Sequence, residues 1–594
     1  MSLKRTINQS WQILDFKEKQ KLVIATFFQS LLNFLDLVGV ISLSFTTYIL
    51  VNKKIPSFKQ LEFLNSIDPN RIAFACVAFT ILLFTCKGLL APALYSRNMV
   101  FLTRVSVKIS LSICGRFFSK PVTFVKKNNS QESAYALSQG VTSSINEILG
   151  SLIILISEAV LLLSLVTVMF FSNWILSILN IVIFGASLFI LNQQVGDRQF
   201  KNTKSRINAI LSGNSLIVSL VSAHREIMVL GKQKFFLTEF ADLRRAESEG
   251  ASKGQVLNVI PKYVFEITFY LGAGGILLFL YYFAEPEYAF TLFVLFIASG
   301  SRILPSILRI QAALSNIRSN EALSLKTFSL ISELDAEESR SGRKAPTRFD
   351  SETKNLMRIR NLRFSYDSNP NWELSIDDLT LPRGSKIAIV GSSGSGKSTL
   401  IDLLLGVLEP DGGEIHFNKN LFDKNFGMKN VAYMPQSITI FNRTIRENIA
   451  LATVPDEIDD SLVEECIQMA GLEGLIQSLP NGTHEKIGED GSTLSGGQKQ
   501  RLGFARVMYQ QPDFLVMDEG TSSLDSESEF AISETISSLK NGLSVLSVAH
   551  RLSTIQNFDL LLYMHNGKID AVGTFNELRN KSAAFNSQAL RMGL

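Results

Sequence analysis

A glycine-rich segment at residues 391–399 has the residue types and spacing of a phosphate-binding loop. It reads Gly-Ser-Ser-Gly-Ser-Gly-Lys-Ser-Thr and lies between apolar runs at 386–390 and 400–405. A buried strand, a glycine loop and a helix in this order let backbone N–H groups surround a polyphosphate, and the helix N-terminus adds its dipole. Lys397 would then supply charge to the outer phosphates, and the Ser398 hydroxyl suits Mg²⁺.

Polar side chains follow further apolar runs of the same half of the chain. Asp518 and Glu519 end the run 514–519, His550 ends the run 545–550, and Gln436 follows 431–435. These positions suit a carboxylate near Mg²⁺, a carboxylate that polarises an attacking water, a histidine on the γ-phosphate and an amide near metal or water. A structural histidine and an ordinary surface glutamine are the alternatives. Tyr366 could stack on adenine or simply pack.

The segment Leu494-Ser-Gly-Gly-Gln498 opens a predicted helix with small residues whose N–H groups and hydroxyl can meet a phosphate. This part of the chain resembles the nucleotide-binding domain of ABC transporters. The resemblance rests on a series of motifs in a fixed order: the glycine loop, Gln436, Leu494–Gln498, the acidic pair Asp518 and Glu519, residues 523–525 and His550. With long apolar segments ahead of that domain, the chain resembles an exporter-type half-transporter over essentially its whole length.

The resemblance implies ATP and Mg²⁺ as cofactors and a homodimer in which each ATP lies between two subunits. Glu519 and His550 would be the catalytic residues, and Mg²⁺ would be held by Ser398, Gln436 and, through a water, Asp518. The family's ATP-binding positions correspond here to Tyr366, Gly391, Ser392, Ser393, Gly394, Ser395, Gly396, Lys397, Ser398, Thr399, Gln436, Ser495, Gly496, Gly497, Gln498 and Asp525. Ser495 and Gly497 would complete the site of the opposite subunit.

Composition places these motifs behind a membrane domain. Hydrophobic residues make up 46% of the 594 residues and charged ones 19%, with 42 Phe, and the apolar excess precedes residue 320. Apolar runs at about 22–51, 72–95, 146–171, 174–193, 257–283 and 288–310 are each near or above the ~20 residues that a spanning helix needs. We therefore predict an α-helical transmembrane domain of six spans (1–325), a polar linker (326–355) and an α/β P-loop ATPase domain (356–594).

Charge patterning predicts the orientation. The long segment 97–144 carries Lys/Arg at 97, 104, 108, 116, 120, 126 and 127 against one acid, Glu132, and the segment 194–262 is also basic. Such loops favour the cytoplasmic side, although the basic loop 52–71 fits poorly. We expect a multi-pass protein of a bacterial inner membrane, with both termini and the ATPase domain cytoplasmic. Short turn-helices near 121–134 and 215–230 would dock onto the second half. A net charge of +4 argues against a nucleic-acid partner.

Ionisable residues inside the predicted spans need a reason, because each is costly there. Counted along the helices, they fall at similar depth: Asp36, Lys87, Glu158, Glu266 and Arg302. They either pair with one another and hold the bundle in register, or line a hydrated cavity whose cations meet an anionic headgroup. The glycines at 272, 274 and 275 would let helices approach closely or bend, with close packing as the default.

Short matches indicate the class of substrate. Residues 36–39, Glu158, 225–231 and 302–306 resemble the exporter branch that includes lipid-linked oligosaccharide flippases. That resemblance implies an amphiphile, a lipid or glycolipid with a phosphate or pyrophosphate head and a sugar. A multidrug, lipid or peptide exporter is the alternative within transport. An ATP-gated pore or regulatory receptor is the alternative of another class, and the intact Glu519 weighs against it.

Overall fold

The computed structural model describes residues 3–52, 68–172, 174–283, 286–340, 348–350, 355–366, 369–418, 421–423, 427–488, 494–518, 542–548 and 555–591. The chain forms two compact units, one of residues 1–120 and 124–339 and the other of residues 121–123 and 340–594. The first unit is helical and the second is α/β. This order of a helical unit and an α/β unit confirms the predicted fold class.

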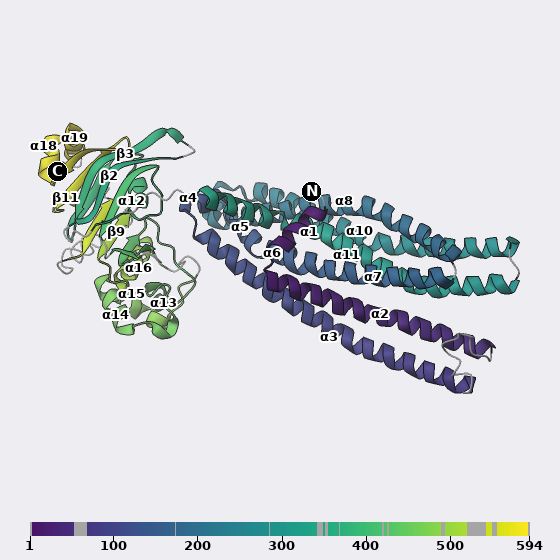
Figure 1. Ribbon diagram of the computed structural model, residues 1–594. Helices are drawn as coiled ribbons and strands as arrows, with labels where there is room; N and C mark the ends of the chain where they lie inside the picture. The colour runs from purple at the N-terminus through teal and green to yellow at the C-terminus, as the bar shows by residue number, and fades with distance from the viewer. Residues whose placement is uncertain are drawn as a thin grey trace. The chain divides into compact units, whose positions relative to one another are not determined.

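Long helices make up most of the first unit (Figure 1). They are α2 (Phe16–Asn52), α3 (Pro69–Phe118), α7 (Ile148–Ser172), α8 (Trp174–Ser222), α10 (Gln233–Phe283) and α11 (Pro286–Arg340). Shorter ones are α1 (Leu3–Gln12), α4 (Val122–Lys127), α5 (Ser130–Leu137), α6 (Gln139–Thr142), the π-helical turn η2 (Ser143–Glu147) and α9 (His224–Leu230). Five of the six predicted apolar runs fall within one long helix each, and the run 146–171 begins in η2 and continues through α7.

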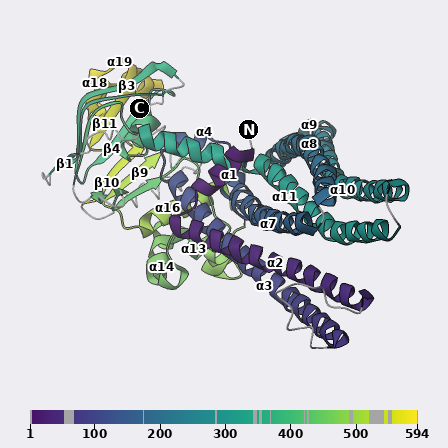
Figure 2. The ribbon, with the colours of Figure 1, turned by 45° about the vertical axis from the view of Figure 1, so that its right-hand side comes forward.

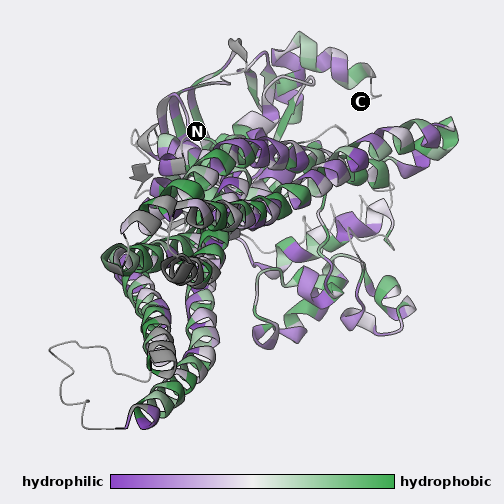
Figure 3. Ribbon diagram, turned by 90° about the vertical axis from the view of Figure 1, so that its right-hand side faces the viewer, coloured by the Kyte–Doolittle hydropathy of each residue, from purple (hydrophilic) through white to green (hydrophobic). Residues whose placement is uncertain are grey.

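Two views of the first unit show the same grouping of its helices. α2 and α3 lie side by side and diverge from α7, α8, α10 and α11 (Figures 1 and 2). Figure 3 shows many hydrophobic residues along α2 and α3 as they run toward the segment 53–67. Apolar helix surfaces of this length suit a bilayer, in which helices satisfy their own backbone hydrogen bonds.

Helix length and hydropathy identify candidate membrane spans among the described residues. Within the described residues, three helical stretches are long and apolar enough to cross a membrane: Phe16–Gly39, Asn70–Phe118 and Ser130–Phe171. The pair Asn180–Ser222 and His224–Leu230, bent by 76°, makes a fourth if counted as one span. Six spans therefore stay a prediction.

Both predicted turn-helix tips are helical. The predicted linker between the two units is shorter than expected. α4 and α5 cover 122–137, and α9 follows α8 after a single-residue break. The linker was predicted to begin at residue 326, but α11 continues to Arg340. The reason is that Leu330 and Leu334 are four residues apart, on one helix face, and are buried together with Phe328.

Close helix packing uses other glycines than those predicted. A Cβ on Gly274 or Gly275 would meet no described atom within 4 Å. In contrast, a Cβ on Gly39 would lie 2.5 Å from the ring of Phe84, and one on Gly300 would lie 2.2 Å from the ring of Phe269. Gly274 and Gly275 therefore show no close packing within the described part of this chain.

The second unit contains a mainly parallel sheet in the order β12-β11-β4-β10-β9-β8. Its strands are β4 (Lys386–Gly391), β8 (Val431–Met434), β9 (Phe514–Asp518), β10 (Ser544–Val548), β11 (Leu560–His565) and the antiparallel β12 (Lys568–Gly573). The central strands are buried and apolar, as parallel strands covered on both faces should be. Their carboxyl ends lie together, since Val548 is level with both Ile389 and Asp518.

A second sheet, in the order β1-β5-β2-β3, packs into the same core. It consists of β1 (Arg348–Asp350), β2 (Asn355–Tyr366), β3 (Asn369–Pro382) and β5 (Gly412–Asn418), and a two-stranded ribbon is formed by β6 (Phe422–Asp423) and β7 (Gly427–Met428). The helices of this unit are α12 (Lys397–Leu404), α13 (Ile445–Ile449), α14 (Asp460–Met469), α15 (Glu473–Ser478), α16 (Gly496–Tyr509), α18 (Phe575–Lys581) and α19 (Ala583–Arg591), with short 3₁₀ turns η4 (Pro455–Glu457) and η5 (Gly482–His484).

Candidate functional site

The glycine loop lies between β4 and α12, at the carboxyl edge of the parallel sheet. Gly394 and Gly396 have φ of +78° and +102°, which side chains with a Cβ rarely adopt. A Cβ on Gly391 would lie 2.3 Å from the carbonyl oxygen of Met564 in neighbouring β11. The sheet therefore brings another backbone so close that this position must be glycine, and the loop is held in a tight curve.

Lys397 and Ser395 give the loop its polar interior. The buried Lys397 Nζ donates to the carbonyl oxygens of Gly391, at 2.9 Å, and Ser392, at 2.8 Å. The Ser395 hydroxyl is buried and has no hydrogen-bond partner among the described residues. The Lys397 ammonium group, which bonds to the loop's own carbonyls, and the unpaired Ser395 hydroxyl both lie inside the glycine loop. A polyphosphate bound there would accept hydrogen bonds from both groups.

Candidate metal ligands lie along the same sheet edge. Asp518 ends β9, and Gln436 follows the neighbouring strand β8, which pairs with β9. The Tyr433 hydroxyl donates to Asp518 Oδ2 at 3.5 Å. Burial, followed by the charges of Asp518 and Asp402, raises the pKa of Tyr433 to about 12, so the phenol keeps its proton. Tyr433 was not anticipated from the sequence, although it belongs to the same strand as the predicted Gln436.

Three predicted residues lie outside the described part of the chain: Glu519, Asp525 and His550. Their roles as base, inter-site residue and γ-phosphate contact stay predictions. The strands that precede two of them are described, and both end at the carboxyl edge of the sheet beside the glycine loop. The described part contains no cluster of His, Cys, Asp and Glu side chains that could hold a metal by themselves.

The Leu494–Gln498 segment forms the start of α16. Ser495 is its N-cap, with its Oγ accepting from Gln498 N at 3.2 Å while Gln498 Oε1 accepts from Ser495 N at 2.8 Å. This reciprocal capping box fixes the first turn and leaves Ser495 exposed. The N–H groups of the first turn and the exposed serine suit an anion that approaches from outside the subunit.

Tyr366 already has contacts within its own unit. Its ring stacks on Trp372, with centroids 6.0 Å apart, and its hydroxyl lies 3.2 Å from Thr399 Oγ1. Trp372 also lies beside the loop, since a Cβ on Gly396 would be 2.9 Å from its ring. The two aromatic rings together border the loop, and the stacking of Tyr366 on adenine stays a prediction. Trp372 was not predicted as a site residue, because nothing in the residue spacing links it to the loop.

The intramembrane charges of the first unit divide into separate pairs. Glu158 on α7 is 5% exposed and accepts from Asn33 Nδ2 at 3.1 Å, Ser306 Oγ at 2.7 Å and Arg309 Nη2 at 3.0 Å. Its Oε1 also forms an ion pair with Arg309 Nε at 2.8 Å. The carboxylate thus ties α7 to α2 and α11. Arg309, seven residues beyond Arg302 and hence on the same helix face, was the missed partner.

The other charges find partners nearer to them. Lys87 on α3 pairs with Asp36 on α2, and both side chains are mostly buried. Glu266 on α10 has Lys262 of the same helix at 3.9 Å. The side chain of Arg302 lies outside the described residues. Among the five predicted residues, the described part shows one mutual ion pair, Asp36 with Lys87.

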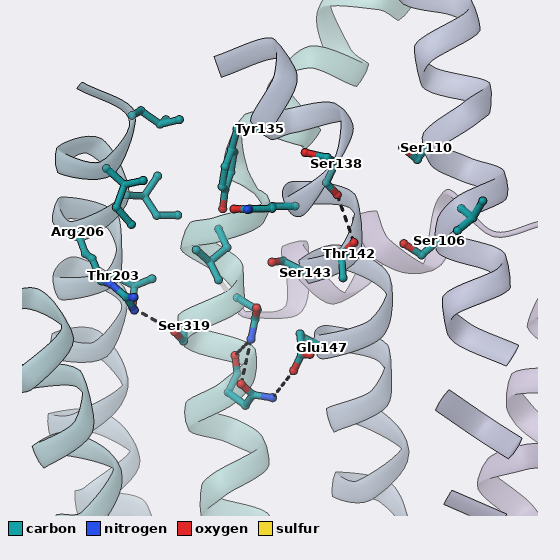
Figure 4. A pocket seen from close by; sticks show the side chains of 18 of the residues that line it. Ser106, Ser110, Tyr135, Ser138, Thr142, Ser143, Glu147, Thr203, Arg206 and Ser319 are labelled. Atoms are coloured by element: carbon teal, nitrogen blue, oxygen red, sulfur yellow. Dashed lines mark hydrogen bonds between the residues drawn. The ribbon is translucent and has the colours of Figure 1, made fainter. Parts of the chain in front are cut away.

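A cavity of about 780 Å³ opens in the first unit between α3, the α5–η2 segment, α8 and α11 (Figure 4). Thr203 and Ser319 share a hydrogen bond of 3.1 Å, and Asn316 donates to Glu147 at 3.2 Å. Burial raises the pKa of Tyr135 to about 12. The lining combines hydroxyl, amide and charged side chains with apolar ones. The polar residues are Ser106, Ser110, Tyr135, Ser138, Gln139, Thr142, Ser143, Glu147, Thr203, Arg206, Asn316, Ser319 and Asn320, and the apolar residues are Val107, Leu111, Ile207, Ile210, Leu211 and Leu323.

Comparison with known proteins relates both units to transporters. The profile of the family described as ABC transporter matches residues 374–522. An ATP-dependent lipid A-core flippase of Wigglesworthia glossinidia brevipalpis is 29% identical over 518 residues, which are 83% of this chain and 85% of that protein. The protein of the same name from Haemophilus influenzae (strain ATCC 51907 / DSM 11121 / KW20 / Rd) is 28% identical over 501 residues, 81% of this chain and 82% of its own length.

A solved structure shares the fold of the whole chain. The bacterial Atm1-family ABC exporter with ATP bound matches with a TM-score of 0.74 at 19% sequence identity, over 98% of this chain and 99% of that chain. At this identity the likeness concerns the fold. It extends across the helical unit as well as the α/β unit.

Proposed function

We propose that this chain, a half-transporter of the ABC transporter family with a helical membrane domain fused to an ABC ATPase domain, uses ATP to flip an amphiphile with a phosphate-bearing and sugar-bearing head between membrane leaflets. The similarity to proteins named lipid A-core flippases carries this proposal, because its 518 residues extend well beyond the ATPase domain. A lipid-linked oligosaccharide is a substrate of this class.

ATP would be held by the glycine loop. The Lys397 ammonium would exchange its bonds to the Gly391 and Ser392 carbonyls for the outer phosphates, and the buried Ser395 hydroxyl would gain a partner. Ser398, Gln436 and Asp518 would hold Mg²⁺, which when bound neutralises charge on the phosphates. Glu519 would take the proton of the attacking water, and His550 would donate to a γ-phosphate oxygen.

A second copy of the chain would complete each site. Ser495 is exposed and held by its capping box, so its hydroxyl and the N–H groups of the first turn of α16 can meet the γ-phosphate on the partner. ATP would then favour the closed pair of ATPase domains, and hydrolysis would release it. The tips α4–α5 and α9 would transmit this change to the spans.

The substrate would be held by polar groups of the helical unit. The cavity lined by hydroxyl and amide groups suits a sugar, which offers donors and acceptors of the same kind (Figure 4). Lys87 and Arg302 would suit the phosphate. The basic segments 97–144 and 194–262 favour a cytoplasmic ATPase domain, and a bacterial inner membrane fits the bacterial relatives.

Reconstitution tests the function directly. Purified protein in proteoliposomes should move a fluorescent lipid-linked oligosaccharide between leaflets when ATP and Mg²⁺ are supplied, and Glu519→Gln should abolish this movement. ATP-independent ion conductance without flipping would support a gated pore instead. Flipping of hydrophobic dyes or peptides but not of the glycolipid would support a multidrug or peptide exporter.

The role of the charged residues in the predicted spans is tested with a variant that leaves no buried charge unpaired. Because Lys87 neutralises Asp36, the double variant Asp36→Asn/Lys87→Gln removes both charges without leaving one unpaired. Loss of substrate-stimulated ATPase with unchanged basal ATPase, in this variant or in Arg302→Gln, would support binding of the headgroup. Equal loss of both activities would contradict it.

A further inference from the structure

A basic cavity of about 890 Å³ lies between α2 and α3, apart from the sites described above. Its polar lining includes Lys21 from α2, and Arg97, Arg104 and Lys108 from α3, with Glu18 as the acid. α2 and α3 lie side by side along this stretch (Figures 1 and 2). The cavity therefore gathers cations from two neighbouring helices.

One of the four cations is neutralised within the chain. Lys108 pairs with Glu18, at 3.0 Å, and with Asp15. These two carboxylates hold the pKa of Lys108 above its ordinary value. The structure records no ion pair of Lys21, Arg97 or Arg104 with any described residue. Three positive charges thus remain without a carboxylate partner among the described residues, around a cavity large enough for a ligand.

The cations are spaced to converge on one ligand. Arg97, Phe101 and Arg104 follow each other at intervals of four and three residues, so they share one face of α3. Lys21 reaches across from α2 and lies over the Phe101 ring, with its Nζ 6.0 Å from the ring centroid. Guanidinium groups bind phosphate through two parallel hydrogen bonds. The geometry suits a phosphate between the two helices.

The position along the helices indicates a lipid as the source of the phosphate. Lys21 directly precedes the apolar run of α2, and Arg97 follows the apolar run of α3 by two residues. Both helices are long and apolar enough to span a membrane. On the apolar side of the cations, Val23, Ile24 and Phe27 on α2 and Leu89 and Leu90 on α3 are exposed. A headgroup in the cavity would place its acyl chains along these residues.

We propose that this cavity binds the anionic headgroup of a phospholipid from the surrounding bilayer, at the membrane surface where α2 begins and α3 emerges. This lipid site is separate from the sites for ATP and for the transported amphiphile, and it does not depend on the identity of that amphiphile. The cations hold the phosphate, and the exposed apolar faces of both helices hold the chains.

Lipid retention in nanodiscs tests the site. Full-length protein in discs of phosphatidylcholine and phosphatidylglycerol should retain phosphatidylglycerol through native mass spectrometry in preference to phosphatidylcholine. Arg97→Gln/Arg104→Gln should bind it about 30-fold more weakly, equivalent to about 2 kcal/mol. Equal retention of both lipids by the unmodified protein would overturn the proposal, whatever the folding of the variants.

A matched control separates a built site from a general excess of cations. Arg198 and Lys201 on α8 are exposed, lie outside the cavity and also follow a predicted span. Arg198→Gln/Lys201→Gln should therefore retain phosphatidylglycerol as the unmodified protein does, and an equal loss would overturn the proposal. Excess inorganic phosphate should leave the lipid bound, because it lacks the chains. Displacement by phosphate alone would identify a simple anion site and would equally overturn it.

Discussion

At the scale of single residues, Lys397 shows how the loop is prepared for its ligand. Its ammonium group donates to two carbonyl oxygens of the loop, so the charge is already directed into the loop interior. ATP binding would redirect these donors rather than bring a side chain from solvent. Such preorganised charge is effective because little reorganisation accompanies the reaction.

Lys397→Met should lower the ATPase rate about 100-fold or more, because charge stabilisation of the transferred phosphate is lost. A phosphate-release assay on purified protein measures this rate. Lys429→Met is the control, since Lys429 is exposed and lies outside the loop, and its rate should be unchanged. A Lys397→Met rate near that of the unmodified protein would show that the loop binds phosphate without this side chain.

Glu158 is a residue whose contacts favour a structural role. It accepts hydrogen bonds from two helices other than its own, and Ser306 and Asn33 are themselves buried. Glu158→Ala would leave these donors unsatisfied and should destabilise the helical unit by about 2 kcal/mol. Glu158→Gln keeps an acceptor and should cost less.

Thermal unfolding in nanodiscs measures the effect of Glu158. The control is Glu266→Ala, which deletes the same carboxylate from α10, where the nearest cation is 3.9 Å away and the side chain is 38% exposed. The apparent Tm should fall for Glu158→Ala and stay nearly constant for Glu266→Ala. Equal shifts would mean that the buried network adds no more stability than an exposed carboxylate.

At the scale of elements, the sequence predicts local structure better than the rotation of one helix against another. Apolar runs mark the long helices and buried strands because burial requires them, and the glycine loop follows its strand as expected. The depth of Glu158 could be counted along its helix, but Arg309 as its partner could not. Which face of α11 meets α7 is decided by packing of the whole unit.

Two other elements show the same limit. The first part of the predicted linker is polar on average, yet its buried Phe328, Leu330 and Leu334 continue α11. Tyr366 was a candidate for adenine on its own, and the pairing of β2 with β3 brings Trp372 against its ring. Both outcomes depend on contacts between segments, which residue spacing along one segment does not contain.

Packing between α10 and α11 depends on Gly300. A Cβ there would lie 2.2 Å from the Phe269 ring, which is too close for any side chain. Gly300→Ala should therefore destabilise the helical unit by about 1–3 kcal/mol. Gly275→Ala on α10 is the matched control, since its Cβ would meet no described atom within 4 Å.

The apparent Tm in nanodiscs reports both glycine variants. It should fall for Gly300→Ala and not for Gly275→Ala, and Phe269→Leu should restore part of the loss by making room for the new methyl group. A Gly300→Ala protein as stable as the unmodified one would mean that Phe269 moves aside at no cost.

At the scale of the whole molecule, the ATPase is proposed to be a property of two chains. One chain contains one glycine loop and one Leu494–Gln498 segment, and a two-fold dimer would join the loop of each copy to the segment of the other. Lys397 and Ser495 of the same chain would then act in different sites. Two inactive variants can test this arrangement, because each keeps the half that the other lacks.

Lys397→Met and Ser495→Ala should each be inactive alone, and a co-reconstituted equal mixture should recover about a quarter of the unmodified ATPase rate. The reason is that half of randomly assembled two-fold dimers are mixed, and each mixed dimer has one intact site, made of Lys397 from one copy and Ser495 from the other. Mixing Lys397→Met with a double variant carrying both substitutions should recover nothing, since no intact pair can form. Ser495 also caps α16, so a variant that keeps the cap is needed as a control. Ser495→Asn keeps a cap but removes the hydroxyl, and it should behave as Ser495→Ala does. Full activity of Ser495→Asn would assign the serine to capping alone.

Absence of recovery in both mixtures would mean that sites of separate chains do not act independently.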